Sequence, residues 1–591
     1  MGSVAIVATI VAVWLGYKYY AASIDRTLIR TDAAKATPAT LYNDGVDYMP
    51  ASASVLFGYQ FKSIAALGPI VGPIIAVQWG WLPALLWLVL GVFFIGWVHD
   101  YMAAVLAMRN EGLTLGGLSY KLISPRARTI LLSFIYFYLL LILGAFGAIA
   151  ARIMANPAVP IGFVILTLAG VLAGQMTYKW HKDLLLTTGL TVGLAIVGIW
   201  VGTTGPARTV VEFINGGPHS FALYSTPYGT MPWSVWIWGI IVLAFCYLGS
   251  VLPIWRFAQP VNYVAFWLVL LGIVGSIVGI FIRMPGFGDF PAFTGFSVTG
   301  ILAPGYATPL WPILFVTIAC GACSGWHSLV STSGTARQLE KETDALPVGA
   351  GAMFTECVLG VLSTVFAVTA FGGFAGYKAA LAQGAGAVFT GGMAEYLHVL
   401  GIPRAFGGAF GAAFLVIMAL TVMQLVLRFM RVASAELVGD RVRAFKNIHV
   451  GSVVGLLLTL LLLWTGFWQR IWILFGGSNQ LFAGLTLVLI VIWLVQTGKP
   501  YLWAFWPAVF MYVTTVAALA ITAWASLEAA ARGIAAPTWS PAFIVGDLIA
   551  AAIGLALTLL SLVLAWDAIH AFVQSRRVHP AAPPAHAPAR A

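Results

Sequence analysis

Apolar runs of about 20 residues follow one another along almost the whole chain, and this feature constrains the fold most. A helix needs about 20 such residues to cross the hydrocarbon core of a bilayer. The runs are apolar at consecutive positions, which argues against the alternating pattern of a transmembrane barrel. The sequence therefore predicts an all-α polytopic membrane protein of about 15 spans. We expect them near residues 4–22, 63–80, 82–108, 129–153, 160–178, 184–203, 235–257, 262–283, 309–331, 350–374, 405–430, 449–467, 470–496, 502–525 and 545–570.

The basic residues test this topology, because Lys and Arg accumulate on the cytoplasmic side of a membrane. With the N-terminus outside and the C-terminus cytoplasmic, most of the 30 Lys and Arg residues fall inside. The net charge of +11 is then explained by topology, and we predict no nucleic-acid partner. The predicted parts are an N-terminal helix (1–24), a cytoplasmic loop (25–62), a transporter core (63–433), further spans (434–572) and a disordered tail (573–591).

The stretch "IAALGPIVGPIIAVQ" (64–78) places two Gly-Pro pairs inside one predicted span. A proline inside a helix removes a backbone hydrogen bond and clashes with the preceding turn. In hydrocarbon the freed backbone groups need partners, so a break is tolerated only against protein or a watery cavity. We interpret the pairs as a broken helix at a binding site; the alternative is a kink packed against neighbouring helices.

A second interruption is expected at "CYLGSVLPIW", within the span 235–257. Five spans separate its start from that of the first broken span, so the two have opposite orientations. This arithmetic fits a five-plus-five inverted repeat, in which discontinuous helices occupy matching places in both halves. We predict that the residues around both breaks line one substrate cavity at the middle of the membrane: Gly68, Pro69, Gly72, Pro73, Gly249, Leu252, Pro253 and Trp255.

Ionisable and hydroxyl side chains within spans are candidates for coupling and gating, because such groups are costly in a membrane. The candidates are His99, Asp100, His327, Ser328, Ser331 and Glu356. For Asp100 an ion pair at the helix end with Arg109 or Lys121 is an equal alternative. The hydroxyls could instead bond preceding carbonyls, and Glu356 could be protonated, paired or part of a proton path.

Several other motifs are weak. The pair Cys320 and Cys323 in "CGAC" lacks the further ligands of a zinc site, so we predict packing residues and no metal. No Walker A or dinucleotide fingerprint is present, so we predict no cofactor and no enzyme activity. The loop "NDGVDYMPA" is only loosely similar to a calcium loop, and we interpret it as a structured cytoplasmic plug or lid.

Taken together, the run from "ATPATLYNDGVDY" through "GWVHDYM", with "TIACGACSGWHSLVS" and "LFGGSNQLFAG", resembles the carbon starvation protein A family over most of residues 25–500. The resemblance implies an inner-membrane importer of the amino acid, polyamine and organocation superfamily type with a LeuT-like core. It also implies uptake of peptides or pyruvate during carbon starvation, usually coupled to protons.

The chain departs from the pattern of that family at two acidic positions. Val261 and Asn262 follow Pro260 where the family resembles Arg-Asp, and Gln424 stands where it resembles an acid one turn before Arg428. An amide does not titrate at physiological pH. We therefore predict that Gln424 does not carry the coupling proton and that Arg428 finds another partner or reaches the headgroups.

These observations predict a secondary active importer of a small carboxylate-bearing solute, pyruvate or short peptides, with H⁺ as its partner ion. Helix N-termini at the breaks would suit a carboxylate. The alternative is a channel or a membrane sensor without transport. The sequence carries no signal for an oligomeric state.

Overall fold

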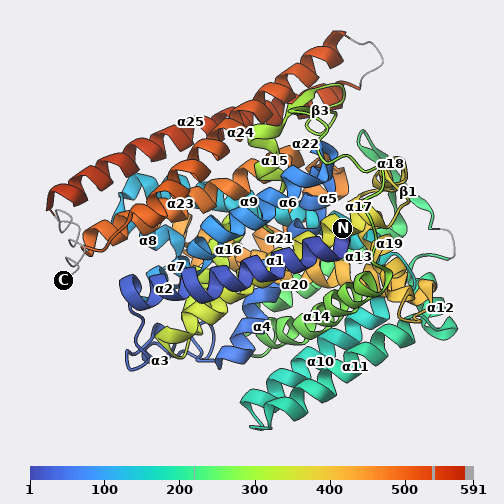
Figure 1. Ribbon diagram of the computed structural model, residues 1–591, viewed down its shortest axis with the longest axis horizontal. Coiled ribbons are helices and arrows are strands. Elements are labelled where there is room, and N and C mark those ends of the chain that lie inside the picture. The colour runs from blue at the N-terminus through green and yellow to red at the C-terminus, as the bar shows by residue number, and fades with distance from the viewer. Residues whose placement is uncertain (218–219, 536–539, 579–591) are drawn as a thin grey trace, which may run out of the picture.

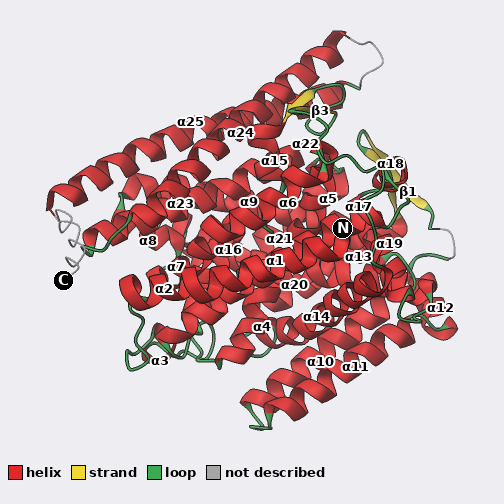
Figure 2. Cartoon of the chain, in the orientation of Figure 1, coloured by secondary structure: helices red, strands yellow, loops and turns green. Residues whose placement is uncertain are grey.

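The computed structural model describes residues 1–217, 220–535 and 540–578, and nearly all regular structure in them is helical (Figures 1 and 2). Within the described residues strands form only two short antiparallel hairpins. They pair β1 (Ala222–Thr226) with β2 (Gly229–Pro232), and β3 (Ser297–Thr299) with β4 (Ala307–Pro309). The predicted all-α fold is confirmed.

In the described part of the chain, 13 helical segments are long and apolar enough to cross a membrane. They are Gly2–Ile29 (α1, Gly2–Leu15, and α2, Ala22–Ile24), Trp81–Met108 (α6, Trp81–Gly91, and α7, Trp97–Met108), α9 (Pro125–Met154), α10 (Pro160–Tyr178), α11 (Leu184–Gly202), α13 (Trp233–Val251), α14 (Ala258–Arg283), Glu342–Thr369 (α17, Gly351–Thr369), α20 (Arg404–Val438), α21 (Ile448–Thr465), Trp468–Gln496 (α22, Trp468–Ile471, and α23, Phe475–Gln496), α24 (Leu502–Ala535) and α25 (Pro541–Val578). Shorter connecting helices are α3 (Pro38–Leu41), α8 (Leu115–Leu122), α12 (Gly205–Ile214), α18 (Phe374–Leu381) and α19 (Ala385–His398).

Two further spans are broken. Helices α4 (Ala53–Ile64) and α5 (Gly68–Ala76) form one span with its continuation to Trp79, bent by 44°. The predicted span 309–331 consists of α15 (Leu310–Thr317) and α16 (Gly325–Ser333), separated by the unwound segment Ile318–Ser324. The predicted spans are therefore all present, two of them as pairs of short helices.

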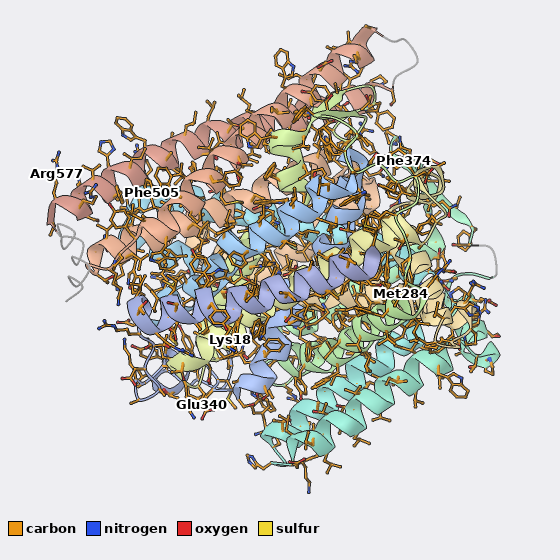
Figure 3. All side chains as sticks on the ribbon, viewed as in Figure 1. Lys18, Met284, Glu340, Phe374, Phe505 and Arg577 are labelled. Carbon is orange, nitrogen blue, oxygen red and sulfur yellow. The ribbon has the colours of Figure 1, made fainter. Side chains whose placement is uncertain are left out.

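The start of α1 and the end of α25 lie on opposite faces of the bundle (Figure 1). Met1, α12, α18 and both strand hairpins lie at the right of the view, on what we call the N face; α3, α8 and the end of α25 lie on the C face. In Figure 3, Met284 and Phe374 mark the N face, and Lys18, Glu340 and Arg577 lie toward the C face. The backbone N–H of Gly2 donates to the Pro285 carbonyl at 3.1 Å, which fixes the first helix at the N face.

The packing of ten spans shows a twofold pattern. Helix α7 packs on α16 as α17 packs on α5, and α14 packs on α4 as α23 packs on α16. Helices α9, α13, α20 and α21 pack together as a second group. These contacts pair the halves Ala53–Arg283 and Leu310–Gln496, once the hairpin α10–α11 is set aside. The five-plus-five repeat is thus present, but its second half begins at Leu310.

The second break is consequently not where the sequence analysis placed it. Helix α13 is continuous to Val251, and the chain leaves the helix at Leu252, whose backbone is extended (φ −76°, ψ 152°). Pro253 terminates a helix here, because a residue before proline disfavours the helical conformation. Helices α10 and α11 are each long and apolar enough to cross a membrane, although they lie outside the repeat. Counting them as core spans placed the start of the second half two spans too early.

The boundaries of the remaining predicted parts also differ in the structure. The first helix extends to Ile29, and the loop ends at Ser52 because α4 belongs to the first broken span. The packed core extends over Ala53–Gln496, beyond the predicted 63–433. The predicted tail begins as the end of α25, through Val578, and residues 579–591 lie outside the described residues.

Candidate functional site

The glycines of the first break are required by close approach to the second. A Cβ on Gly72 would lie 2.3 Å from the Thr317 carbonyl oxygen, and one on Gly68 would lie 2.3 Å from Cys320 Sγ. The prolines bend the same segment: Pro69 occupies the first turn of α5, where its missing N–H costs little, and Pro73 lies inside α5. In the pattern Gly-Pro-x-x-Gly-Pro, the prolines therefore bend the helix and the glycines allow its close contact with the second broken span.

Side chains satisfy the carbonyls that the breaks release. The indole N–H of Trp326 donates to Ser63 O at 2.7 Å, and the ammonium of Lys62 donates to Ala65 O at 3.1 Å. The indole of Trp87 donates to Phe315 O and Ile318 O, both at 3.1 Å. The breaks thus face protein, as backbone in a membrane must.

Asn479 holds the opposite edge of the second break. Its side-chain oxygen accepts from the Trp326 backbone N–H at 3.0 Å, near the start of α16, and from the Tyr138 hydroxyl at 2.7 Å. Its amide nitrogen donates to Ser324 Oγ at 3.0 Å. Asn479 is not among the residues predicted for the site, although its amide within the apolar run "LFGGSNQLFAG" was a signal.

Four predicted coupling residues meet in one buried chain. His327 Nδ1 lies 3.0 Å from Asp100 Oδ2, and His327 Nε2 lies 3.2 Å from Glu356 Oε2. His99 Nδ1 lies 2.8 Å from the other oxygen of Asp100. All four side chains are fully buried. They come from α7, α16 and α17, so three helices of one packing group build the chain His99–Asp100–His327–Glu356, hereafter the relay.

Asp100 therefore does not form the helix-end ion pair that was its alternative. Arg109 binds Glu342 instead, with Nε 2.6 Å from Oε1. The two predicted serines lie beside the relay and bond elsewhere. Ser328 Oγ donates to the Gly325 carbonyl at 2.6 Å, and Ser331 Oγ accepts from Gln60 Nε2 at 3.1 Å.

Two residues that sequence reasoning missed adjoin the relay. Lys62 is fully buried on α4 and lies close enough to Glu356 for their charges to attract. Its signal was a lysine within an apolar run just before the break. A donor atom of Cys320 lies within 4.8 Å of donors of His327 and Glu356, a set that could hold a divalent ion. This set is not visible in the sequence, because His327 and Glu356 come from different helices and Glu356 lies far from Cys320 along the chain.

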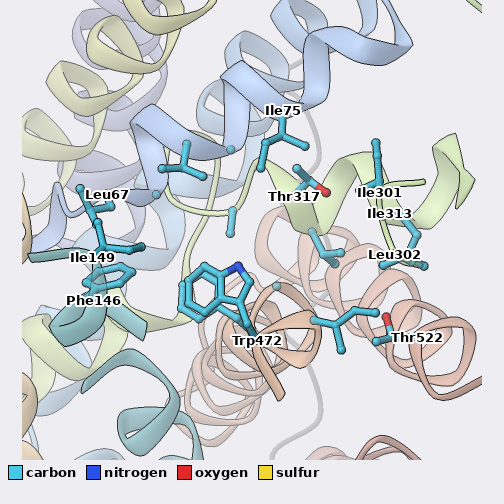
Figure 4. A pocket seen from close by; sticks show the side chains of 18 of the residues that line it. Leu67, Ile75, Phe146, Ile149, Ile301, Leu302, Ile313, Thr317, Trp472 and Thr522 are labelled. Atoms are coloured by element: carbon cyan, nitrogen blue, oxygen red, sulfur yellow. The ribbon is translucent and has the colours of Figure 1, made fainter. Parts of the chain in front are cut away.

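A cavity of about 350 Å³ extends from the two breaks toward the N face. Figure 4 shows Trp472 in its middle, with Leu67, Phe146 and Ile149 on one side and Ile301, Leu302 and Ile313 on the other. Gly68 and Gly72 belong to the lining, as do Val71, Ile75, Val316, Thr317, Ala319, Trp468, Ile473, Phe475, Gly476 and Thr522. Of the predicted substrate residues, these two glycines line it; Pro69 and Pro73 lie on the same helix.

The other predicted substrate residues lie together at the C face. Arg428 donates to the carbonyls of Gly249, at 3.1 Å, and Leu252, and it pairs with Asp47. The Trp255 indole donates to Gly45 O at 3.0 Å. Gly249 and Leu252 therefore contact α20, and Trp255 contacts residue Gly45 of the loop. These three residues and Pro253 do not line the cavity.

Residues 43–51 form an ordered loop that packs against the C face, and we call this loop the inner seal. The Val46 carbonyl accepts a hydrogen bond from the backbone N–H of Ile254 at 3.0 Å, and the backbone N–H of Ala51 donates to the Gln338 carbonyl at 3.0 Å. The inner seal thus joins the turn after α13 to the segment after α16. Burial would raise the pKa of Asp47, but the guanidiniums of Arg428 and Arg431 outweigh burial and hold that pKa below its ordinary value. The loop is structured, as predicted, and Arg428 has found another partner.

Comparison with known proteins identifies the family to which the sequence is similar. The family model of carbon starvation protein CstA matches residues 1–375 and 373–518. The peptide transporters CstA of Campylobacter jejuni and Bacillus subtilis are each 28% identical over 86% of this chain, covering 79% and 88% of those proteins. The pyruvate/proton symporter BtsT of Escherichia coli is 32% identical over 61% of this chain and 48% of its own length.

Solved structures align more distantly. A mutant of the manganese transporter of Eremococcus coleocola aligns with a TM-score of 0.43 at 12% identity, over 90% of this chain and 99% of that one. MhsT in complex with L-phenylalanine aligns with a TM-score of 0.40 at 14% identity, over 87% and 99%. The match of the family model over nearly nine-tenths of the sequence, together with the curated relatives, shows that the chain belongs to the carbon starvation protein CstA family.

Proposed function

We propose that this protein is a proton-coupled importer of short peptides or pyruvate in the inner membrane, with its N face outside. The observation that carries the proposal is a cavity that ends on two helix breaks, beside a buried chain of titratable groups. Helix N-termini at such breaks suit a substrate carboxylate through their dipoles. The relatives named as peptide transporters and as a pyruvate/proton symporter support the same activity.

The structure has the features of one state in an alternating-access cycle. The cavity reaches from the breaks toward the N face, while the inner seal joins both helix groups at the C face. Both breaks belong to the group α4–α7 and α15–α17, whereas α9, α13, α20 and α21 form the other group. Rocking of one group against the other would close the cavity and separate the inner seal.

The relay gives this movement a coupling ion. A histidine with a carboxylate at each ring nitrogen can receive a proton on one side and pass it on at the other. When His327 is protonated at both ring nitrogens, the positive charges of Lys62 and the imidazolium balance the negative charges of Asp100 and Glu356. One further proton gives the buried group a net charge. The relay lies wholly within the group that carries the breaks, so its charge acts on the moving part.

Uptake into proteoliposomes tests the proposal. With an acidic exterior, wild-type protein should accumulate labelled dialanine or pyruvate with saturation and should show counterflow. Glu356→Gln and Asp100→Asn should lose accumulation driven by the pH gradient while retaining counterflow, because an amide does not titrate. Glu395→Gln, at an ion pair with Arg283 remote from the relay, is the matched control and should behave as wild type.

The outcomes separate the two parts of the proposal. Absence of saturable uptake of either solute by the wild-type protein would refute transport. Equal proton influx in wild type, Glu356→Gln and Asp100→Asn would leave the importer but remove the relay as its coupling path.

A further inference from the structure

The side chains that line the cavity are mostly apolar. Among the described residues that line it, no side chain is charged, and the hydroxyls are those of Thr317 and Thr522. The walls are aliphatic on α5 and α15 and aromatic at Phe146, Trp472 and Phe475. Trp472 stacks on Phe475 with centroids 4.3 Å apart and planes 11° apart, so the aromatic wall is held in place.

The size of the cavity also limits which molecules can fill it. At about 350 Å³ it is at the lower end of the range for small-molecule sites, roughly 300–1,000 Å³. A keto acid as small as pyruvate would leave most of this volume empty and bring little apolar surface to the walls. A dipeptide or tripeptide with a branched or aromatic side chain would fill it, with its carboxylate at the breaks.

The geometry points to selectivity for short peptides that carry bulky apolar side chains, with the side chain held between α5, α9, α15 and Trp472. This inference rests on the proposed import function and names the substrate class of the same cavity. Burial of each further methylene group is worth about fourfold in affinity. Dileucine and alanyl-phenylalanine should therefore bind at least about tenfold more tightly than dialanine, diaspartate or pyruvate.

Competition against uptake of labelled dialanine in proteoliposomes measures this order. Val71→Trp places a large ring into the cavity from α5 and should remove the advantage of dileucine and alanyl-phenylalanine over dialanine, read as the ratio of their binding constants from the thermal stabilisation of the purified protein as well as from competition. Leu90→Trp, at a side chain 48% exposed on the outer surface of α6, is the matched control and should keep the wild-type order.

Each result bears on the inference. The expected order in wild type, lost in Val71→Trp and kept in Leu90→Trp, supports it. Equal competition by all dipeptides, or strongest competition by pyruvate, overturns the selectivity and leaves the importer standing. No saturable uptake of any of these compounds overturns both.

Discussion

At the scale of single residues, glycine decides where the two broken spans meet. Gly72 leaves room for the Thr317 carbonyl, and Gly68 leaves room for Cys320. Neither is explained by a positive φ; both are explained by contact. A small residue at such a point lets backbones approach within a membrane, where packing replaces the hydrophobic drive.

Replacement of Gly72 by alanine should therefore reduce substrate uptake about tenfold or more, because a methyl group 2.3 Å from a backbone oxygen forces α5 and α15 apart at a cost of roughly 1–3 kcal/mol. Gly193→Ala on α11, where a Cβ meets nothing within 4 Å, is the matched control. Uptake per inserted protein is the measurement. Equal uptake in the two variants would show that this contact is not needed.

The ionisable residues show what sequence can and cannot supply at this scale. His99, Asp100, His327 and Glu356 were each conspicuous, because charge inside an apolar run is costly. Their pairing was not predictable, since it depends on three helices far apart in sequence. Arg428 illustrates the same limit: the missing acid at Gln424 predicted a new partner, and only the fold identifies it as Asp47.

At the scale of elements, the two helix breaks differ in how clearly the sequence indicates them. The first carries prolines, whose chemistry interrupts a helix wherever they occur. The second, Ile318–Ser324, contains small residues instead and is held open by Asn479 and Trp87 from other helices. Sequence therefore reveals the first break and misassigns the second to Pro253, which ends α13.

The inner seal is an element whose strength can be measured. Asp47→Asn removes its charge pair with Arg428, and hydrogen exchange of residues 43–51 should quicken by about tenfold or more, because hydrogen bonds to charged groups contribute about 1.5–3 kcal/mol. Asp440→Asn, at an exposed pair with Lys446 on the same face, is the control and should leave that exchange unchanged.

The pH dependence of the inner seal follows from the lowered pKa of the Asp47 carboxyl. Because the pKa of Asp47 lies below its ordinary value of 3.8, the stabilisation is complete above that value and is lost as pH falls through the lower, folded-state pKa. Opening of the seal, followed by exchange corrected for the intrinsic rate, should thus be constant between about pH 5 and 8. A change within that range would show that another group titrates there.

At the scale of the whole molecule, the twofold pattern accounts for the inverted halves and for their unequal lengths in sequence. The hairpin α10–α11 interrupts the first half with two spans, an even number, so the orientation of everything after it is preserved. It lies at the edge of the bundle, beyond α14 (Figure 1). Repeat counting from hydropathy fails here because an added hairpin is as apolar as the core.

The relay, buried within the group that would move, has an electrical consequence. A proton carried there crosses part of the membrane field when that group changes the face it serves, and a full crossing is worth about 2.3 kcal/mol per 100 mV. An inside-negative potential, imposed with potassium and valinomycin at equal pH on both sides, should therefore accelerate uptake of a neutral dipeptide in wild type. In Glu356→Gln the same potential should have little effect. Voltage-independent uptake by the wild type would mean that the relay carries no net charge across, and the protein would then exploit the chemical gradient of protons without the electrical one.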